Sequence, residues 1–250
     1  MRFFEYFFRA NEDGFVLKLY GPVHLTMVTI FILGCILIAK KFNGHEKSSK
    51  NQTFMKTLAL ILLVDQIILY SWQVGSGYFR LDMSLPLYHC RLAAWALIIG
   101  VLFDISSIKT IGLFWGTMGS LISMVMPELY AFSFPHYTNI QYFIVHLSMG
   151  WMALYMLIVE KMPVSKKQCS TVLLATNFFN VFLVAVNLGL RLVYPKVNYG
   201  YMLDFPGSLA GLLSPVAHII FMFAAFNLGV LILYSLFRLA QKSGDKERYA

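Results

Sequence analysis

The sequence has few charged residues, and this shortage narrows the classes of protein to which the chain can belong. Aspartate, glutamate, lysine and arginine together make up 13% of the 250 residues, whereas a soluble domain is closer to about 25% charged. Hydrophobic residues account for 58%, and the mean hydropathy is +0.67. A soluble globular protein is therefore excluded, and the composition predicts a polytopic membrane protein.

Cysteine is also scarce, and the three thiols form no recognisable pattern. Cys35, Cys90 and Cys169 are an odd number, lie far apart and fall at different predicted depths, so no disulfide framework is expected. The short CxxC and HxxxH spacings of zinc sites are missing, and the sequence predicts no metal and no cofactor. The first 20 residues contain charges and no small-residue cleavage site, so a cleaved signal peptide is not expected.

The sequence does contain a series of long apolar stretches. Each is roughly 20 residues long, which is the length that a helix needs to cross the hydrocarbon core of a bilayer. The sequence therefore predicts an all-α polytopic membrane protein in which about seven transmembrane helices form one bundle. The stretches are approximately residues 21–40, 54–74, 87–104, 108–126, 139–160, 169–191 and 213–237.

The bundle is expected to occupy residues 21–238, with a segment of different character on each side. Residues 1–20 are predicted to be an interfacial N-terminal segment, because four phenylalanines between residues 2 and 9 share one helical face. Residues 239–250 are rich in charge and are predicted to be a cytoplasmic tail.

The distribution of basic residues predicts that the N-terminus is outside and the C-terminus inside the cell membrane. With this orientation the cytoplasmic loops and tail hold thirteen of the 20 lysines and arginines, as the positive-inside rule requires. The net charge of +8 is thereby explained by topology and anionic lipid, and no nucleic-acid partner is expected. Five of the six histidines then fall near the outer ends of the spans or in outer loops, and only His45 lies inside.

The stretch from Leu85 to Cys90 joins two apolar runs and carries the one cysteine at a membrane edge. Pro86 fits the first turn of a helix and Ser84 can cap it, which places Cys90 about one turn inside that helix. The unpaired N–H groups at a helix start favour a thiolate. The alternative interpretation is an ordinary membrane-edge cysteine.

A histidine is expected at a depth similar to that of this cysteine. Pro135 ends an outer loop and a helix is predicted to begin around Thr138, so His146 lies about two turns further along the helix. A cysteine and a histidine at one depth can form a nucleophile and its base. A lone histidine in an apolar helix can equally be a hydrogen-bonded core residue.

Other polar side chains are expected to line a cavity that opens toward the outer leaflet. Ionisable groups inside membrane spans are costly, so they usually face the bundle interior and mark function. Hydrogen bonds between helices are the alternative role for the amides. The candidates for oxyanion stabilisation or substrate binding are His24, Asp65, His89, His136, Asn187, Asn198 and His218.

Three patterns taken together resemble the YwaF-like family of bacterial integral membrane proteins. They are Leu-Pro-Leu-x-x-Cys at 85–90, Phe-Pro-His-Tyr at 134–137 with a histidine ten residues on, and Asn-Tyr-x-x-x-Leu at 198–203. That family is similar to an animal transmembrane acyltransferase that remodels phospholipids through a cysteine. The resemblance implies a compact multi-helix fold, with Cys90 as the acyl-accepting nucleophile and His146 as its base.

The sequence therefore favours a membrane lipid acyltransferase or lipid ester hydrolase that works at the extracytoplasmic leaflet. Its partner would be a membrane phospholipid or another lipid, and His89 or Asn187 could stabilise the oxyanion. The alternative is a carrier or binding protein for a small polar solute or lipid, without covalent chemistry, whose site is Asp65 and the asparagines. A structural or assembly protein without chemistry is the third interpretation.

Overall fold

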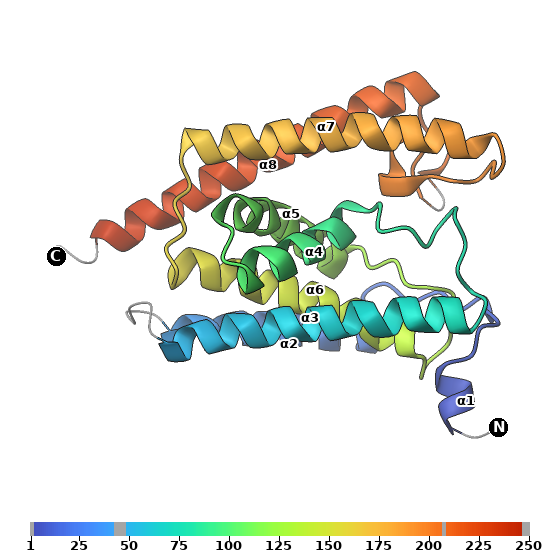
Figure 1. Cartoon of the computed structure of the whole chain (residues 1–250), viewed down its shortest axis with the longest axis horizontal. Helices are drawn as coiled ribbons and strands as arrows, with labels where there is room; N and C mark the ends of the chain where they lie inside the picture. The colour runs from blue at the N-terminus through green and yellow to red at the C-terminus, as the bar shows by residue number, and fades with distance from the viewer. Residues whose placement is uncertain (1–2, 43–48, 207–208, 247–250) are drawn as a thin grey trace. The chain divides into compact units, whose positions relative to one another are not determined.

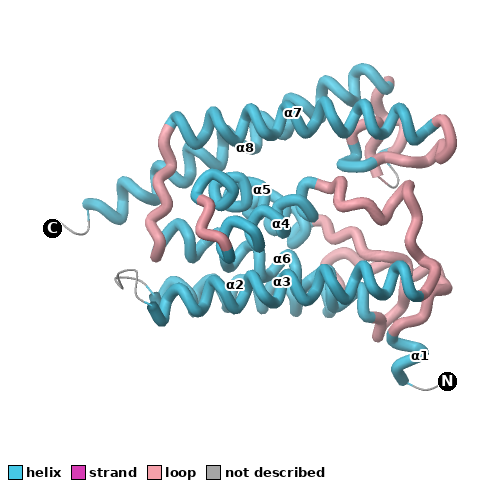
Figure 2. Tube along the Cα trace, in the orientation of Figure 1, coloured by secondary structure: helices cyan, strands magenta, loops and turns pink. Residues whose placement is uncertain are grey.

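The structure is a computed structural model that describes residues 3–42, 49–206 and 209–246, and in that part of the chain every regular element is a helix (Figure 2). Six helices are long and apolar enough to cross a membrane. The chain is therefore an all-α, multi-pass membrane protein, as predicted. The helices are α1 (Phe3–Phe7), α2 (Pro22–Phe42), α3 (Ser49–Gly75), α4 (His89–Leu102), α5 (Ser106–Val125), α6 (Tyr137–Ile158), α7 (Lys166–Arg191), the 3-10 turn η1 (Tyr199–Tyr201) and α8 (Pro215–Lys246).

The chain divides into two compact units. Unit 1 consists of Met1–Phe79 and Ala93–Met162, and unit 2 consists of Arg80–Leu92 and Pro163–Ala250. The boundary passes through α4, whose first four residues belong to unit 2. His45, the histidine expected on the inner side, lies outside the described residues.

The expected third span, at 87–104, is shorter than predicted. Its helix α4 has 14 residues, which at 1.5 Å per residue is about 21 Å. The hydrocarbon core of a bilayer is roughly 30 Å thick. The prediction of about seven transmembrane helices is thus confirmed for six of them, and α4 is too short to span the core alone.

Helix α6 is the centre of unit 1, where it packs against α2, α3 and α5 (Figure 1). Two glycines allow α2 and α6 to approach closely. A Cβ added to Gly34 would lie 2.3 Å from the Trp151 ring, and one added to Gly150 would lie 2.4 Å from the Phe31 ring. These are contacts between small and large residues of the kind that hold membrane helices together without help from water.

The contacts at the helix ends of unit 1 fix the directions of its helices. The Trp72 indole at the end of α3 donates to the Phe8 carbonyl at 2.9 Å, and the His136 ring at the start of α6 bonds the Arg9 carbonyl at 3.0 Å. At the opposite end, Lys109 in the first turn of α5 pairs with Glu160 just beyond α6 at 3.7 Å. Helices α3 and α5 therefore both run antiparallel to α6. Because α3 and α5 run in the same direction, the chain returns through α4, which lies between them in the sequence.

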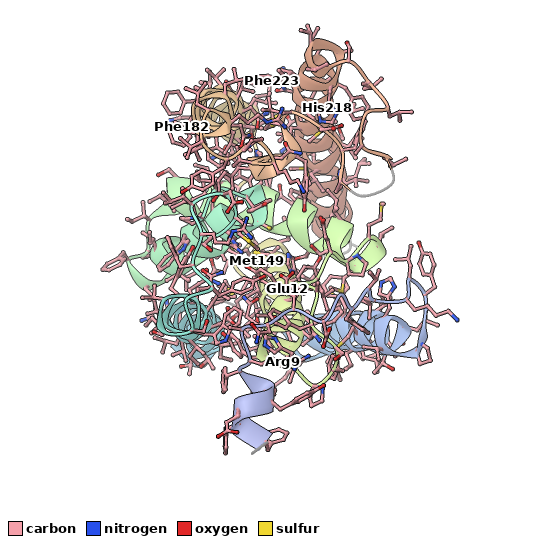
Figure 3. The ribbon with its side chains drawn as sticks, turned by 90° about the vertical axis from the view of Figure 1, so that its right-hand side faces the viewer. Arg9, Glu12, Met149, Phe182, His218 and Phe223 are labelled. Atoms are coloured by element: carbon pink, nitrogen blue, oxygen red, sulfur yellow. The ribbon has the colours of Figure 1, made fainter. Side chains whose placement is uncertain are left out.

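Within unit 1, polar contacts hold the N-terminal segment against the loop that precedes α6. Arg9 binds Asp13 at 2.8 Å and the Ser133 carbonyl at 2.8 Å; Figure 3 labels Arg9 close to α1. The Ser133 hydroxyl also donates to Asp13, and this bond, followed by those from Arg9 and two backbone N–H groups, holds the pKa of the carboxyl well below its usual range. The interfacial location of residues 1–20 itself stays a prediction.

Unit 2 is built on α7 and α8, which pack against each other. Asn177 and Asn227 exchange two amide hydrogen bonds of 2.8 and 2.9 Å between these helices. Helix α8 continues to Lys246, past residue 238, where the bundle was expected to give way to a tail.

The close contact between α2 and α6 predicts a loss of stability for Gly34→Ala. The added methyl group would meet the rigid Trp151 ring, and overpacking of this kind costs about 1–3 kcal/mol. Gly75→Ala is the matched control, because a Cβ there meets nothing within 4 Å. Thermal unfolding of the two purified variants in detergent measures the difference. Equal midpoints would show that the contact does not limit stability.

Candidate functional site

The structure distributes the expected site residues over both units, and it therefore leaves the pairing of Cys90 with His146 a prediction. Cys90 belongs to unit 2 and His146 to unit 1. Of the other candidates, His24, Asp65 and His136 lie in unit 1, and His89, Asn187, Asn198 and His218 lie in unit 2.

Cys90 is the second residue of α4, and its side chain is partly exposed. Like Cys35 and the buried Cys169, it forms no disulfide with another described residue. The expected position about one turn inside the helix was wrong, because α4 begins only at His89. Ser84 does not cap α4 as expected, since its hydroxyl accepts a hydrogen bond from the Arg80 N–H at 3.0 Å.

Tyr199 explains why the residues before α4 are not helical. Its buried hydroxyl accepts the Leu85 N–H at 3.1 Å and donates to the Leu81 carbonyl at 2.8 Å. Asn187 in turn fixes Tyr199, donating to its carbonyl at 2.8 Å and accepting its N–H at 2.7 Å. The Asn187 amide is therefore used on both sides, which argues against its expected role as an oxyanion donor.

The His89 ring points into the interior of unit 2, between α7 and α8. It stacks on Phe226 with the ring centroids 3.9 Å apart and meets the edge of Phe179 at 4.9 Å. Its Nε2 lies 2.9 Å from Oδ1 of Asn180. Asn180 is fully buried, and its Nδ2 has no hydrogen-bond partner among the described residues. Because buried donors are rarely left unpaired, this amide group is a candidate ligand contact.

Asn198 and His218 organise the loop between α7 and α8. Asn198 donates to the Asp204 carbonyl at 2.8 Å and accepts the Leu203 N–H at 3.0 Å. The backbone N–H of Gly211, which is the largest cause, and the backbone N–H of Phe205 donate to the Asp204 carboxylate and lower its pKa. His218, labelled near the start of α8 in Figure 3, bonds the Tyr201 carbonyl through Nε2 at 2.7 Å.

Two of the candidate histidines serve helix ends with both ring nitrogens. His24 accepts the Tyr20 N–H at Nδ1 and bonds the Met124 carbonyl through Nε2, each at 2.9 Å. His136 caps α6 by accepting the Thr138 N–H at 3.2 Å, and its Nε2 bonds a backbone carbonyl of the N-terminal segment. Neither ring has a nitrogen left to act as a base.

His146 and His218 each have one buried ring nitrogen without a hydrogen-bond partner among the described residues. His146 Nδ1 lies 2.7 Å from the Tyr142 carbonyl, so Nδ1 carries the hydrogen and Nε2 presents a lone pair. That Nε2 is buried and has no partner among the described residues. Nδ1 of His218 is in the same situation. These two rings therefore have the arrangement that a general base needs.

Asp65 forms a polar network in unit 1 that ties α3 to α6. It is 6% exposed, and its Oδ2 accepts hydrogen bonds from Gln66 at 3.1 Å and from Gln141 at 2.9 Å. The Tyr137 hydroxyl donates to the Asp65 carbonyl at 3.1 Å. In the part of the chain that the structure describes, no group of three or more histidine, cysteine or acidic residues could hold a metal ion.

Sequence reasoning did not single out Tyr199. Its hydroxyl bonds residues more than 110 positions earlier in the chain, and no local pattern reveals such a contact. The only signal was its place directly after Asn198, in the Asn-Tyr pair at 198–199.

A family model described as the TMEM164 family matches residues 19–235. Comparison with curated proteins and with solved structures gives no match. The match confirms the expected resemblance to a membrane-protein family over nearly the whole chain, and the narrower YwaF-like assignment stays a prediction.

The cap of α6 predicts a pH-dependent contribution to stability. Burial, the largest cause, lowers the pKa of His136, and the neutral ring is the form that accepts the Thr138 N–H. The folded-state pKa thus lies below the unfolded value of about 6.5. The stabilisation is complete above that pH and is lost as the pH falls toward the folded-state pKa.

His136→Asn tests this, since asparagine also caps helices but does not titrate. We expect the thermal midpoint of the native protein to fall more steeply than that of the variant as the pH drops below about 6.5. Parallel curves would exclude His136 as the source.

Proposed function

The chain belongs to the TMEM164 family, which is linked to acyltransferase activity, and we propose that it is a membrane lipid acyltransferase or lipid ester hydrolase with Cys90 as nucleophile. The position of Cys90 carries the proposal. A partly exposed thiol at the second residue of α4 lies where backbone N–H groups and the helix dipole favour a thiolate. The substrate would be a membrane phospholipid or another lipid ester.

The proposed reaction has two steps. The Cys90 sulfur attacks the ester carbonyl, the ester bond breaks, and the base that took the thiol proton returns it to the leaving alcohol. An acceptor alcohol then attacks the thioester and releases the thiol, giving transfer, or water does so, giving hydrolysis. His146 is the proposed base, and its unpartnered Nε2 supports this role. His218 is the alternative within unit 2, with an unpartnered Nδ1.

An oxyanion would form on the carbonyl oxygen in each step and needs hydrogen-bond donors. Asn187 is unsuitable because both sides of its amide bond Tyr199. We propose Asn180 as the donor to the oxyanion, because its Nδ2 is buried and has no partner among the described residues. His89 orients that amide through its 2.9 Å contact with Oδ1, so it is a positioning residue.

A carrier or binding function is the second candidate, and the buried Asp65 network favours it. A carboxylate inside a membrane span is costly and usually functional. The Asp65 side chain is 6% exposed, and it takes no part in the proposed acyl transfer. Chemistry at Cys90 separates the two candidates.

The reactivity of Cys90 provides the first test. We expect a lipophilic electrophile to label Cys90 at least about tenfold faster than Cys35, because the N–H groups at a helix start favour the reactive thiolate. Cys90→Ala should abolish acyl turnover from a phospholipid, while Cys35→Ala, the matched control, should retain it. A folded Cys90→Ala protein with native turnover would reject covalent catalysis and favour the carrier.

The base is identified with the same assay. His146→Ala should lose turnover, and the double variant with Cys90→Ala should be no worse than either single variant, since a nucleophile and its base act as a unit. Full activity in His146→Ala, with loss in His218→Ala, would transfer the role to His218.

The proposed orientation places Cys90 at the extracytoplasmic leaflet of the cell membrane. The bias of lysine and arginine supports this, and cysteine accessibility tests it. In a cysteine-free background, Asn11→Cys should react with a membrane-impermeant maleimide on intact cells, and Lys166→Cys only after permeabilisation. Both positions are exposed. The reverse pattern would place the N-terminus in the cytoplasm.

A further inference from the structure

Asp65 lies in the apolar part of α3 and has no basic partner in the part of the chain that the structure describes. The side chain is 6% exposed, and it lies inside the candidate membrane span Gln52–Gly75. Among the described residues, none forms an ion pair with it. The basic residues of unit 1 that do form ion pairs, Arg9 and Lys109, are paired with other acids.

An ionised carboxylate in this position is strongly unfavourable unless a positive charge accompanies it. The amide N–H groups of Gln66 and Gln141 both bind Oδ2 of Asp65. These donors are neutral, and they offset only part of the cost of removing the charge from water. The cluster therefore has one negative group and, among the described residues, no basic side chain to balance it.

Gln66 supplies an independent observation that points to the same missing charge. Its side chain is 1% exposed, and its Nε2 donates to Asp65 at 3.1 Å. The Oε1 of that same amide is buried and has no partner among the described residues. A buried carboxylate and an unpaired acceptor oxygen on the group that binds it are both satisfied by one cation. Sodium binds such oxygens as a hard ion, and a proton on the carboxyl can be donated to the amide oxygen.

We propose that Asp65 and Gln66, together with Gln141, form a buried binding site for one positive charge, filled by a proton or by a sodium ion. The groups that face Asp65 are Gln66 from α3 and Gln141 and Tyr137 from α6. A single carboxylate with neutral amides suits one charge better than a divalent ion.

The site links cation binding to the packing of two helices. Asp65 and Gln66 belong to α3, whereas Gln141 and Tyr137 belong to α6. An unbalanced charge between these helices would weaken their contact, so a bound cation stabilises the folded state by mass action. The stability of unit 1 therefore measures how far the Asp65 site is occupied by a cation, whether or not the protein catalyses acyl transfer.

Asp65→Asn is the central variant, because asparagine keeps the shape and has no charge to balance. We expect the thermal midpoint of the full-length protein in detergent to rise with sodium at constant ionic strength, or to fall as the pH is raised. The variant should lose that dependence. Identical dependence on sodium and pH in the native protein and in Asp65→Asn would overturn the proposal.

Carbodiimide labelling distinguishes the two cations, because dicyclohexylcarbodiimide reacts with protonated carboxyl groups in apolar surroundings. A proton site predicts modification of Asp65 that declines as the pH rises and that sodium does not affect. A sodium site predicts several-fold slower modification in sodium than in choline at one pH. Mass spectrometry of the Asp65 peptide measures both rates.

Gln66→Met tests the second ligand, since methionine has a similar length and no amide oxygen. We expect this variant to weaken the sodium effect several-fold or, at a proton site, to move the pH dependence to higher pH, because the carboxylate loses the N–H donor of Gln66. Gln73→Met is the matched control. Gln73 is also buried on α3, and its Oε1 has no partner among the described residues, but its amide bonds Tyr130 and not Asp65. Equal behaviour of the two variants would remove Gln66 from the site.

Discussion

The need to satisfy every backbone and side-chain polar group without water governs this structure. A bilayer core supplies no hydrogen-bond partners, so groups at helix ends must find them inside the protein. Tyr199 does this for the segment before α4, where one hydroxyl serves Leu81 and Leu85. His24 and His136 do the same at the ends of α5 and α6. Several of the polar side chains at these helix ends are therefore structural.

The polar groups that remain unpaired stand out against this background. Most buried polar atoms in native proteins have partners, and in the described part of the chain the exceptions include Asn180 in unit 2 and Gln66 and His146 in unit 1. Each of these groups lies beside a chemically active side chain or is itself one. The proposals for acyl transfer and for cation binding both start from such unpaired atoms, but they concern different units and different chemistry.

The sequence predicted features that depend on local pattern and missed those that depend on distant contacts. Apolar length identified six spans, and the start of α6 was expected at Thr138, one residue from its observed position at Tyr137. Pro86 suggested a helix start that Tyr199 overrides from another part of the chain. His24 and His136 looked like site residues because polarity at a membrane edge has the same pattern whether it caps a helix or binds a ligand.

The shortness of α4 has a consequence for the lipid around it. A helix of about 21 Å leaves roughly 9 Å of the hydrocarbon thickness to the non-helical residues that adjoin it. Where lipid contacts a short helix, hydrophobic mismatch is relieved by local thinning of the bilayer, by snorkelling of flanking side chains or by association with other helices. Glycerol ester groups lie at the boundary between headgroups and acyl chains, and thinning would draw that boundary inward. A thiol at the start of a short helix would then meet the esters without any lipid having to leave its leaflet.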